Sequence, residues 1–280
     1  MQMFLNRKLV IATMHQKEQA IQPILESNLG CICCVPENFN TDLLGTFSGE
    51  IERLDDPIAT ARKKCQLAMD LTNTDIAVSS EGSFGSHPSY FFIHADDEFL
   101  LLLDRKHNLE IVVRELSLET NFNGAFVSDE IELKEFTERA KFPSHGLILR
   151  KSADELIDVS KGITTWEELI TKYTLLKEKY GKVYIETDMR AMYNPTRMEV
   201  IQKLTQKLVD KINSICPDCS TPGFGVTDVK MGLPCQQCSF PTRSIKSHVY
   251  ACTVCKYSEE KLFPNGKLNE EPMFCDRCNP

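Results

Sequence analysis

Cys216-Pro217-Asp218-Cys219 is the first of four Cys-x-x-Cys pairs near the end of the chain. The others are Cys235/Cys238, Cys252/Cys255 and Cys275/Cys278, so eight of the twelve cysteines lie in the last 65 residues. A two-residue spacer lets both sulfurs of a pair face one point, which suits a tetrahedral Zn²⁺ ion. The spacings C-x2-C-x15-C-x2-C and C-x2-C-x19-C-x2-C are typical of zinc ribbons.

The alternative use of these thiols is in disulfides, which need an oxidising compartment. Met1 to Lys17 contains neither the apolar core nor the cleavage site of a secretory signal. Because all the ligands are cysteines and none is left over, neither site keeps an open position for catalysis. We therefore expect two structural Zn²⁺ ions, which stabilise a segment too short to fold on its own apolar core.

The four Cys-x-x-Cys pairs, called knuckles below, can be combined into two zinc sites in two ways. Sequential pairing joins neighbouring pairs and gives two ribbons in series, whereas alternate pairing places Cys216, Cys219, Cys252 and Cys255 on one ion and gives a cross-brace. Each half contains a hairpin candidate, at Met231-Gly232-Leu233 and at Pro264-Asn265-Gly266-Lys267. Because Asn-Gly is a strong hairpin signal, the sequence favours sequential pairing.

Composition indicates a water-soluble globular protein with one sizeable domain and one small one. The chain has 280 residues, 42% of them hydrophobic and 26% charged. The longest apolar run, Phe99 to Leu103, is too short to span a membrane, so we expect a cytoplasmic protein without a membrane partner. Residues 216–280 hold seven Lys/Arg and seven Asp/Glu, so charge does not support nucleic acid as a partner.

Strands and helices alternate along the first part of the chain, which predicts an α/β fold with a central mixed sheet and helices on both faces. Buried strands are expected over residues 8–13, 31–35 and 75–80, with helices over 15–28 and 56–71 and a polar loop over 36–48. Asp56-Pro57 is a typical helix start.

Further elements follow as far as the first knuckle. We expect a hairpin over 99–104 and 109–114, strands over 146–150 and 182–187, and helices over 129–141, 164–180 and 196–215. The last helix leads directly into Cys216, so the predicted domains are residues 1–214 and 215–280.

Two polar clusters follow early strands, where open α/β sheets bind ligands. Thr13, His15 and Lys17 begin a helix, and helix amides with a lysine form an anion site, or else a capped helix with solvent-facing charges. Glu81 is followed by Gly82 and Gly85, so a metal such as Mg²⁺ could approach it closely. The alternative is an exposed glutamate on a glycine-rich turn.

A third polar cluster follows the strand over 182–187. It combines two carboxylates with groups suited to phosphate recognition: Glu186, Asp188, Arg190, Asn194, Thr196 and Arg197. His145 and Arg150 could join it. The alternative is an internal network of ion pairs.

The first hundred residues resemble the inosine/xanthosine triphosphatases. The similar residues are Ala61, Arg62 and Ala68 in a helix, Glu81-Gly82 after a strand, and Thr196 with Arg197 at the start of a late helix. The resemblance implies hydrolysis of purine nucleoside triphosphates with Mg²⁺ or Mn²⁺. It implies that Glu81 binds the metal and that Thr196 and Arg197 contact phosphate.

The whole chain is more similar to an uncharacterised bacterial family known only as a domain of unknown function. The similar segments are 12–15, 80–85, 186–191, 194–197 and the closing Cys278-Asn279-Pro280. This resemblance spans both predicted domains and implies no activity.

Two functions are consistent with these patterns. The first is metal-assisted phosphoanhydride hydrolysis, in which Glu81 holds Mg²⁺ or Mn²⁺, Asp188 or Glu186 supplies a second carboxylate, and Lys17, Arg190 and Arg197 neutralise the phosphates. The ligand would be a nucleotide or another phosphorylated small molecule. The second is a binding module whose zinc ribbon docks a protein or nucleic acid through Arg243, Lys246, His248 and Tyr250.

Overall fold

The structure is a computed structural model that describes residues 3–37, 39 and 56–280. The chain divides into two compact units, Met1–Leu208 and Val209–Pro280. The division falls inside helix α5 (Pro195–Asn213), slightly before the boundary expected at residue 214. Most of the polar loop expected over residues 36–48 lies outside the described residues.

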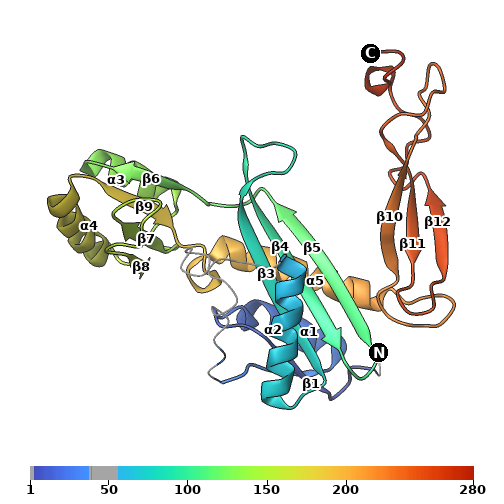
Figure 1. The fold of residues 1–280 in the computed structure, drawn as a ribbon, viewed down its shortest axis with the longest axis horizontal. Helices are drawn as coiled ribbons and strands as arrows, with labels where there is room; N and C mark the ends of the chain where they lie inside the picture. The colour runs from blue at the N-terminus through green and yellow to red at the C-terminus, as the bar shows by residue number, and fades with distance from the viewer. Residues whose placement is uncertain (1–2, 38, 40–55) are drawn as a thin grey trace. The chain divides into compact units, whose positions relative to one another are not determined.

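The first unit is built on a mixed sheet of five strands in the order β2-β1-β3-β4-β5 (Figure 1). These strands are β1 (Lys8–Ile11), β2 (Ile32–Cys34), β3 (Ile76–Ser86), β4 (His94–Asp104) and β5 (Leu109–Ser117). β1 runs parallel to β2 and β3, whereas β4 pairs antiparallel with β3 and β5. The carboxyl ends of β1 and β3 therefore point to the same edge of the sheet.

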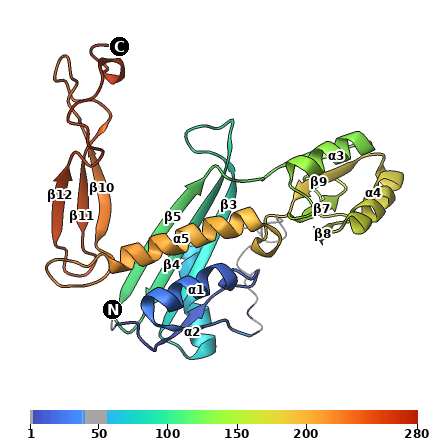
Figure 2. The same ribbon diagram turned by 180° about the vertical axis from the view of Figure 1, so that it is seen from behind.

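Helices cover both faces of this sheet, as expected for the predicted α/β class. Helix α2 (Pro57–Thr72) packs on one face, where Ala61, Cys65 and Ala68 meet the buried side chains of Val10 and Ala77. Helices α1 (Glu18–Leu29) and α5 lie on the opposite face (Figures 1 and 2). None of the helices in the described part of the chain is long and apolar enough to cross a membrane.

Strand β3 is longer than the sequence predicts. Glu81 to Gly85 do not form a glycine-rich turn but continue the strand, with Gly82 opposite Glu98 in the register with β4. A Cβ atom on Gly82 would lie 2.2 Å from Glu98 Oε1 and 2.7 Å from Arg197 Nη2. Glycine is tolerated here inside a strand because other groups approach its backbone closely.

The later strands form a second sheet rather than joining the first, so the prediction of one central sheet is incomplete. Its antiparallel order is β6-β9-β7-β8, made of β6 (Gly124–Val127), β7 (Leu147–Arg150), β8 (Ser160–Ile163) and β9 (Val183–Thr187). Helices α3 (Glu130–Arg139) and α4 (Trp166–Tyr180) pack on it and close a separate apolar core around Phe136, Leu149, Tyr173 and Ile185.

The second unit contains one antiparallel sheet with strands β10 (Gly225–Met231), β11 (Ile245–Ala251) and β12 (Ser258–Leu262). Ser247 is the only buried residue in these three strands. Since so little apolar surface is removed from water, the sheet cannot be stabilised by a conventional core.

Candidate functional site

The eight cysteines of the second unit form two groups of four. Within each group the Sγ atoms all lie within 4.8 Å of one another. The Sγ atoms are 3.6 Å apart in Cys216/Cys255 and 3.9 Å apart in Cys235/Cys278. Tetrahedral Zn²⁺ with Zn–S bonds of about 2.3 Å requires sulfurs about 3.8 Å apart, so both groups fit a zinc ion.

The grouping is alternate, so the prediction of sequential pairing is wrong. Cys216, Cys219, Cys252 and Cys255 form one group, and Cys235, Cys238, Cys275 and Cys278 form the other. The cause is strand pairing: β10 and β11 run antiparallel with Gly225 opposite Ala251. This register brings the start of β10, which follows the first knuckle, to the end of β11, which precedes the third.

All four knuckles share one backbone pattern. The amide four residues after the first cysteine donates to the carbonyl of that cysteine, from Ser220, Ser239, Lys256 and Asn279. Ser220, Ser239 and Lys256 also have positive φ angles of 58°, 58° and 65°. The repeated turn shows that each Cys-x-x-Cys segment is shaped locally to present both sulfurs to one point.

A second group of polar residues lies in the first unit, at the carboxyl end of β1 and β3. Lys17 is 7% exposed and donates from Nζ to the carbonyl (3.1 Å) and the hydroxyl (2.9 Å) of Ser80. Helix α1 begins only at Glu18, because Gln16 has a φ of 58° that a helix cannot include. Lys17 therefore occupies the N-cap and reaches inward to β3.

On the α2 side of β3, Lys64 Nζ lies 2.5 Å from Glu81 Oε1. Both residues are buried, at 8% and 3% exposed. Glu81 thus faces a lysine rather than an open loop. Because side chains alternate along a strand, Glu81 lies on the opposite face of the sheet from Gly82 and from Glu98, the register partner of Gly82.

On the other face, Arg197 at the start of α5 is completely covered and binds Glu98 of β4. Arg197 Nε lies 2.6 Å from Glu98 Oε1, and Nη1 donates to the carbonyl of Met189 at 2.6 Å. Its guanidinium also stacks on Phe84, 5.0 Å from the ring centroid. Asp96 lies two residues before Glu98, and burial followed by the charge of Glu98 raises the pKa of its carboxyl to about 8.

His15 lies in the same electrostatic environment. Burial lowers the pKa of its imidazole to about 4, and the charges of Lys17, Arg190 and Arg197 add to this effect. The charges of Lys17, Arg190 and Arg197 therefore all influence the imidazole of His15, although the two arginines are far from it in the sequence. Thr13 is also buried at the end of β1, with 6% of its surface exposed.

Asp188 is fully buried and holds Arg190. Its carboxylate accepts bonds from the Arg190 side chain at 2.6 to 3.2 Å and from the Gly162 amide at 3.0 Å. The Arg190 guanidinium stacks on Tyr193, with 4.6 Å to the ring centroid. Asp188 is therefore a fixed anchor for an arginine that is itself partly exposed.

Glu186 lies apart, in a 2.8 Å ion pair with Arg150. Burial raises the pKa of Glu186, and the charge of Arg150 opposes this shift. Thr196 contacts His145, whose Nε2 lies 2.9 Å from the threonine hydroxyl. The predicted catalytic role of Glu186 and phosphate contact of Thr196 stay predictions.

Asn194 organises the start of α5. Its side-chain oxygen accepts a bond from the Arg197 amide at 3.0 Å, and its side-chain nitrogen donates to Asn121 at 2.8 Å. This cap fixes the backbone from which Arg197 reaches Glu98. Asn194 thus positions Arg197, and a direct contact with ligand stays a prediction.

Three residues of the polar group were not selected from the sequence: Lys64, Asp96 and Glu98. Lys64 lies among the apolar positions of α2, and its buried position depends on the packing of that helix. Asp96 and Glu98 share one face of β4 with Leu100 and Leu102. Two acidic residues that alternate in phase with buried leucines are the pattern in the sequence that indicates their burial.

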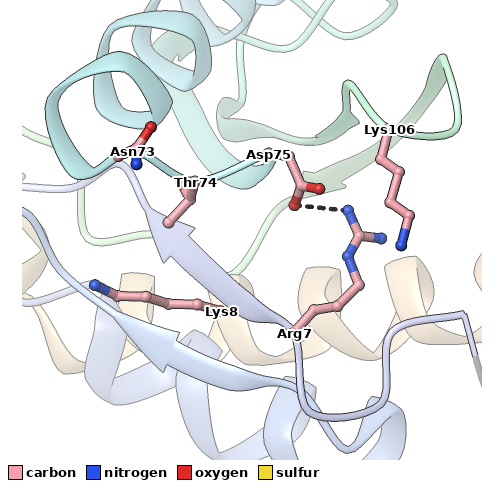
Figure 3. A pocket seen from close by; sticks show the side chains of 6 residues that line it. All are labelled: Arg7, Lys8, Asn73, Thr74, Asp75 and Lys106. Carbon is pink, nitrogen blue, oxygen red and sulfur yellow. Dashed lines mark hydrogen bonds and ion pairs between the residues drawn. The ribbon is translucent and has the colours of Figure 1, made fainter.

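A hollow at the other end of the sheet has a different character. Figure 3 shows Arg7, Lys8, Asn73, Thr74, Asp75 and Lys106 around it. Arg7 is held by Asp75 at 2.8 Å and by Asp104 at 2.5 Å, so its charge is already balanced. Because open α/β sheets bind ligands at the carboxyl ends of their strands, we place the candidate site at Lys17 and not here.

Lys17 gives a prediction about pH. Burial lowers the pKa of its ammonium from 10.5 to about 8, so between these values the unfolded chain binds more protons than the folded one. This group therefore makes the free energy of unfolding rise with pH across that window. Below pH 8 the ammonium is charged in both the folded and the unfolded chain, so the full cost of burying that charge is present. We expect the difference in unfolding free energy between wild type and Lys17→Met to change in favour of wild type by roughly 3 kcal/mol from pH 7.5 to 10.5.

The measurement is urea denaturation followed by the fluorescence of Trp166, the only tryptophan and a residue of the first unit. A difference between the two proteins that stays constant with pH would contradict the buried, destabilised ammonium.

A search of curated proteins found no match. The family model described as "Domain of unknown function (DUF6671)" matches residues 64–280. This range contains both cysteine groups, Lys64, Glu81, Asp96, Glu98 and Arg197, and it begins after Lys17. The chain belongs to the DUF6671 family, a domain of unknown function.

Proposed function

We propose that the first unit binds a phosphorylated small molecule, with a nucleoside triphosphate as the leading candidate, at the carboxyl end of β1 and β3. The observation that supports this is Lys17. Its ammonium is buried, and within the described residues its hydrogen bonds go only to the uncharged oxygens of Ser80. Burying a cation without a counter-ion is costly, and a bound phosphate would supply the missing charge.

The proposed reaction is hydrolysis of a phosphoanhydride bond with Mg²⁺ or Mn²⁺. Catalysis of phosphoryl transfer rests on positioning and on neutralising the charge of the phosphoryl oxygens. Lys17, Lys64 and Arg197 are the buried cations of the site, and Arg190 is a partly exposed one. In this proposal the carboxylate of Glu81 fixes Lys64 toward the phosphates, since it lies 2.5 Å from Nζ.

The test is hydrolysis of a panel of nucleoside triphosphates by the zinc-loaded protein with Mg²⁺. We expect at least one substrate to be turned over, and Glu81→Gln to lower its kcat/KM by about 100-fold. Glu119→Gln is the matched control, because Glu119 forms an exposed ion pair with Lys203. The hydrolase proposal fails if no triphosphate is turned over, or if the Glu81 and Glu119 variants behave alike.

The second unit offers less support for the alternative of a docking module. Basic side chains of this unit form ion pairs with acidic ones, as in Lys230 with Glu260 and Arg243 with Asp276. Tyr250 is partly covered and packs against Phe224. Docking of a protein or nucleic acid therefore stays a prediction, and the proposed zinc ions are assigned a structural role.

A further inference from the structure

Strand β4 carries two buried carboxylates on the same face of the sheet. Asp96 is 1% exposed and Glu98 is 0% exposed. In each of them one oxygen has no hydrogen-bond partner among the described residues, namely Asp96 Oδ1 and Glu98 Oε2. A buried carboxylate oxygen without a hydrogen-bond partner is costly, so these two atoms call for a ligand.

A third oxygen without a partner lies at the end of β1. The hydroxyl of Thr13 is buried and forms no hydrogen bond with any residue that the structure describes. These three oxygens lie on β4 and just beyond the end of β1. Oxygen atoms of this kind accept hydrogen bonds or coordinate hard cations.

The position of Glu98 is fixed by its surroundings. Arg197 Nε binds Oε1 at 2.6 Å, which leaves Oε2 as the atom without a partner. The carboxylate occupies the space that a side chain on Gly82 would fill, because a Cβ there would lie 2.5 Å from Glu98 Cδ. Carboxylates that bind a metal usually also accept a hydrogen bond from a neighbouring residue, and this bond orients them toward the ion.

We propose that Asp96 and Glu98 bind one hard divalent cation, Mg²⁺ or Mn²⁺, through these two oxygens. Adjacent same-face positions on a strand are about 7 Å apart at Cα, which allows two carboxylates to converge on one ion. Mg²⁺ is commonly held by one or two carboxylates, with water and substrate phosphates completing its shell. A bound cation would interact favourably with both carboxylates once Asp96 is ionised. The assignment of the phosphates as further ligands rests on the proposed function.

This assignment replaces Glu81 as the predicted metal ligand. Glu81 is engaged by Lys64 and lies on the opposite face of the sheet from Asp96 and Glu98, so it cannot share one ion with them. Within the described residues only the two cysteine groups offer three or more ligand atoms close together. A cation held by two protein carboxylates therefore needs its remaining ligands from water or substrate.

The experiment is titration of the zinc-loaded chain with MnCl₂, followed by the electron paramagnetic resonance signal of free Mn²⁺. Cysteine thiolates prefer Zn²⁺ to Mn²⁺, so the cysteine sites do not interfere. We expect one saturable Mn²⁺ per chain, and Asp96→Asn should weaken its binding at least tenfold. Asp97→Asn is the matched control, since Asp97 lies on the opposite face of β4 and binds Arg114 at the surface.

Asp96→Asn keeps the side-chain shape and adds no charge at this buried position, so it should fold, which Trp166 fluorescence checks. The proposal is overturned if wild type shows no saturable Mn²⁺ site, or if the Asp96 and Asp97 variants bind Mn²⁺ equally. Binding of a non-hydrolysable triphosphate is measured in parallel, both without divalent ions and with Mn²⁺. Triphosphate binding without a Mn²⁺ site refutes the cation site alone, whereas a Mn²⁺ site without triphosphate binding under either condition refutes the proposed function alone.

Discussion

Replacing Cys219 and Cys252 together by serine is expected to lower the zinc content of the purified chain from two ions to one. Replacing Cys219 and Cys238 together is expected to remove both ions. The reason is the alternate grouping, in which Cys219 and Cys252 share one site and Cys238 belongs to the other. Elemental analysis of the dialysed proteins measures this directly. Sequential pairing predicts the reverse, with one zinc left in the Cys219/Cys238 variant.

The loss of zinc should also unfold the second unit. A structural Zn²⁺ supplies about 10–16 kcal/mol of apparent folding free energy, and this sheet has almost no core to replace it. In the zinc-free double variant we expect rapid proteolysis after residue 208 and an unchanged Trp166 fluorescence transition, because Trp166 belongs to the first unit. A second unit that stays resistant to protease without zinc would contradict this account.

Glu98→Gln should be among the most destabilising single changes in the first unit. It removes the counter-charge of Arg197, which is completely buried and bound to Glu98 at 2.6 Å. Leaving one member of a buried ion pair without its partner costs about 3–5 kcal/mol. Urea denaturation in metal-free buffer, followed by Trp166 fluorescence, measures this loss.

Two controls give that measurement its meaning. Glu119→Gln breaks an exposed pair with Lys203 and should cost less than about 1 kcal/mol. Combining Glu98→Gln with Arg197→Met removes both charges, so the double variant should be more stable than the sum of the single effects predicts. Equal losses in the Glu98 and Glu119 variants would show that the buried pair carries no special energetic role.

Much of the local structure could be predicted from the sequence. The cap at Asp56 forms as expected, with its side chain accepting bonds from the amides of Ile58 and Ala59. The hairpin of β4 and β5 also forms as predicted, and α4 (Trp166–Tyr180) lies within the helix expected over residues 164–180. These features depend on short-range patterns that a sequence states directly: apolar alternation, capping residues and glycine.

Pairings between distant segments could not be predicted in the same way. The grouping of the cysteines depends on the register of β10 with β11, which separates knuckles that are adjacent in the sequence. The role of Gly82 depends on Glu98 and Arg197, both far away along the chain. Lys64 looked like an ordinary helix residue because its partner Glu81 is identified only when α2 packs on β3.

Lys17 is the residue on which the proposed site depends most, since within residues 3–37, 39 and 56–280 its buried ammonium donates only to the neutral oxygens of Ser80. The direct measurement is the calorimetric titration of the zinc-loaded protein with a non-hydrolysable triphosphate analogue at pH 7. We predict one site per chain, weakened at least tenfold by Lys17→Met and unchanged by Lys106→Met, which alters the hollow at the other end of the sheet. Absence of binding, or equal affinity in both variants, would contradict the account.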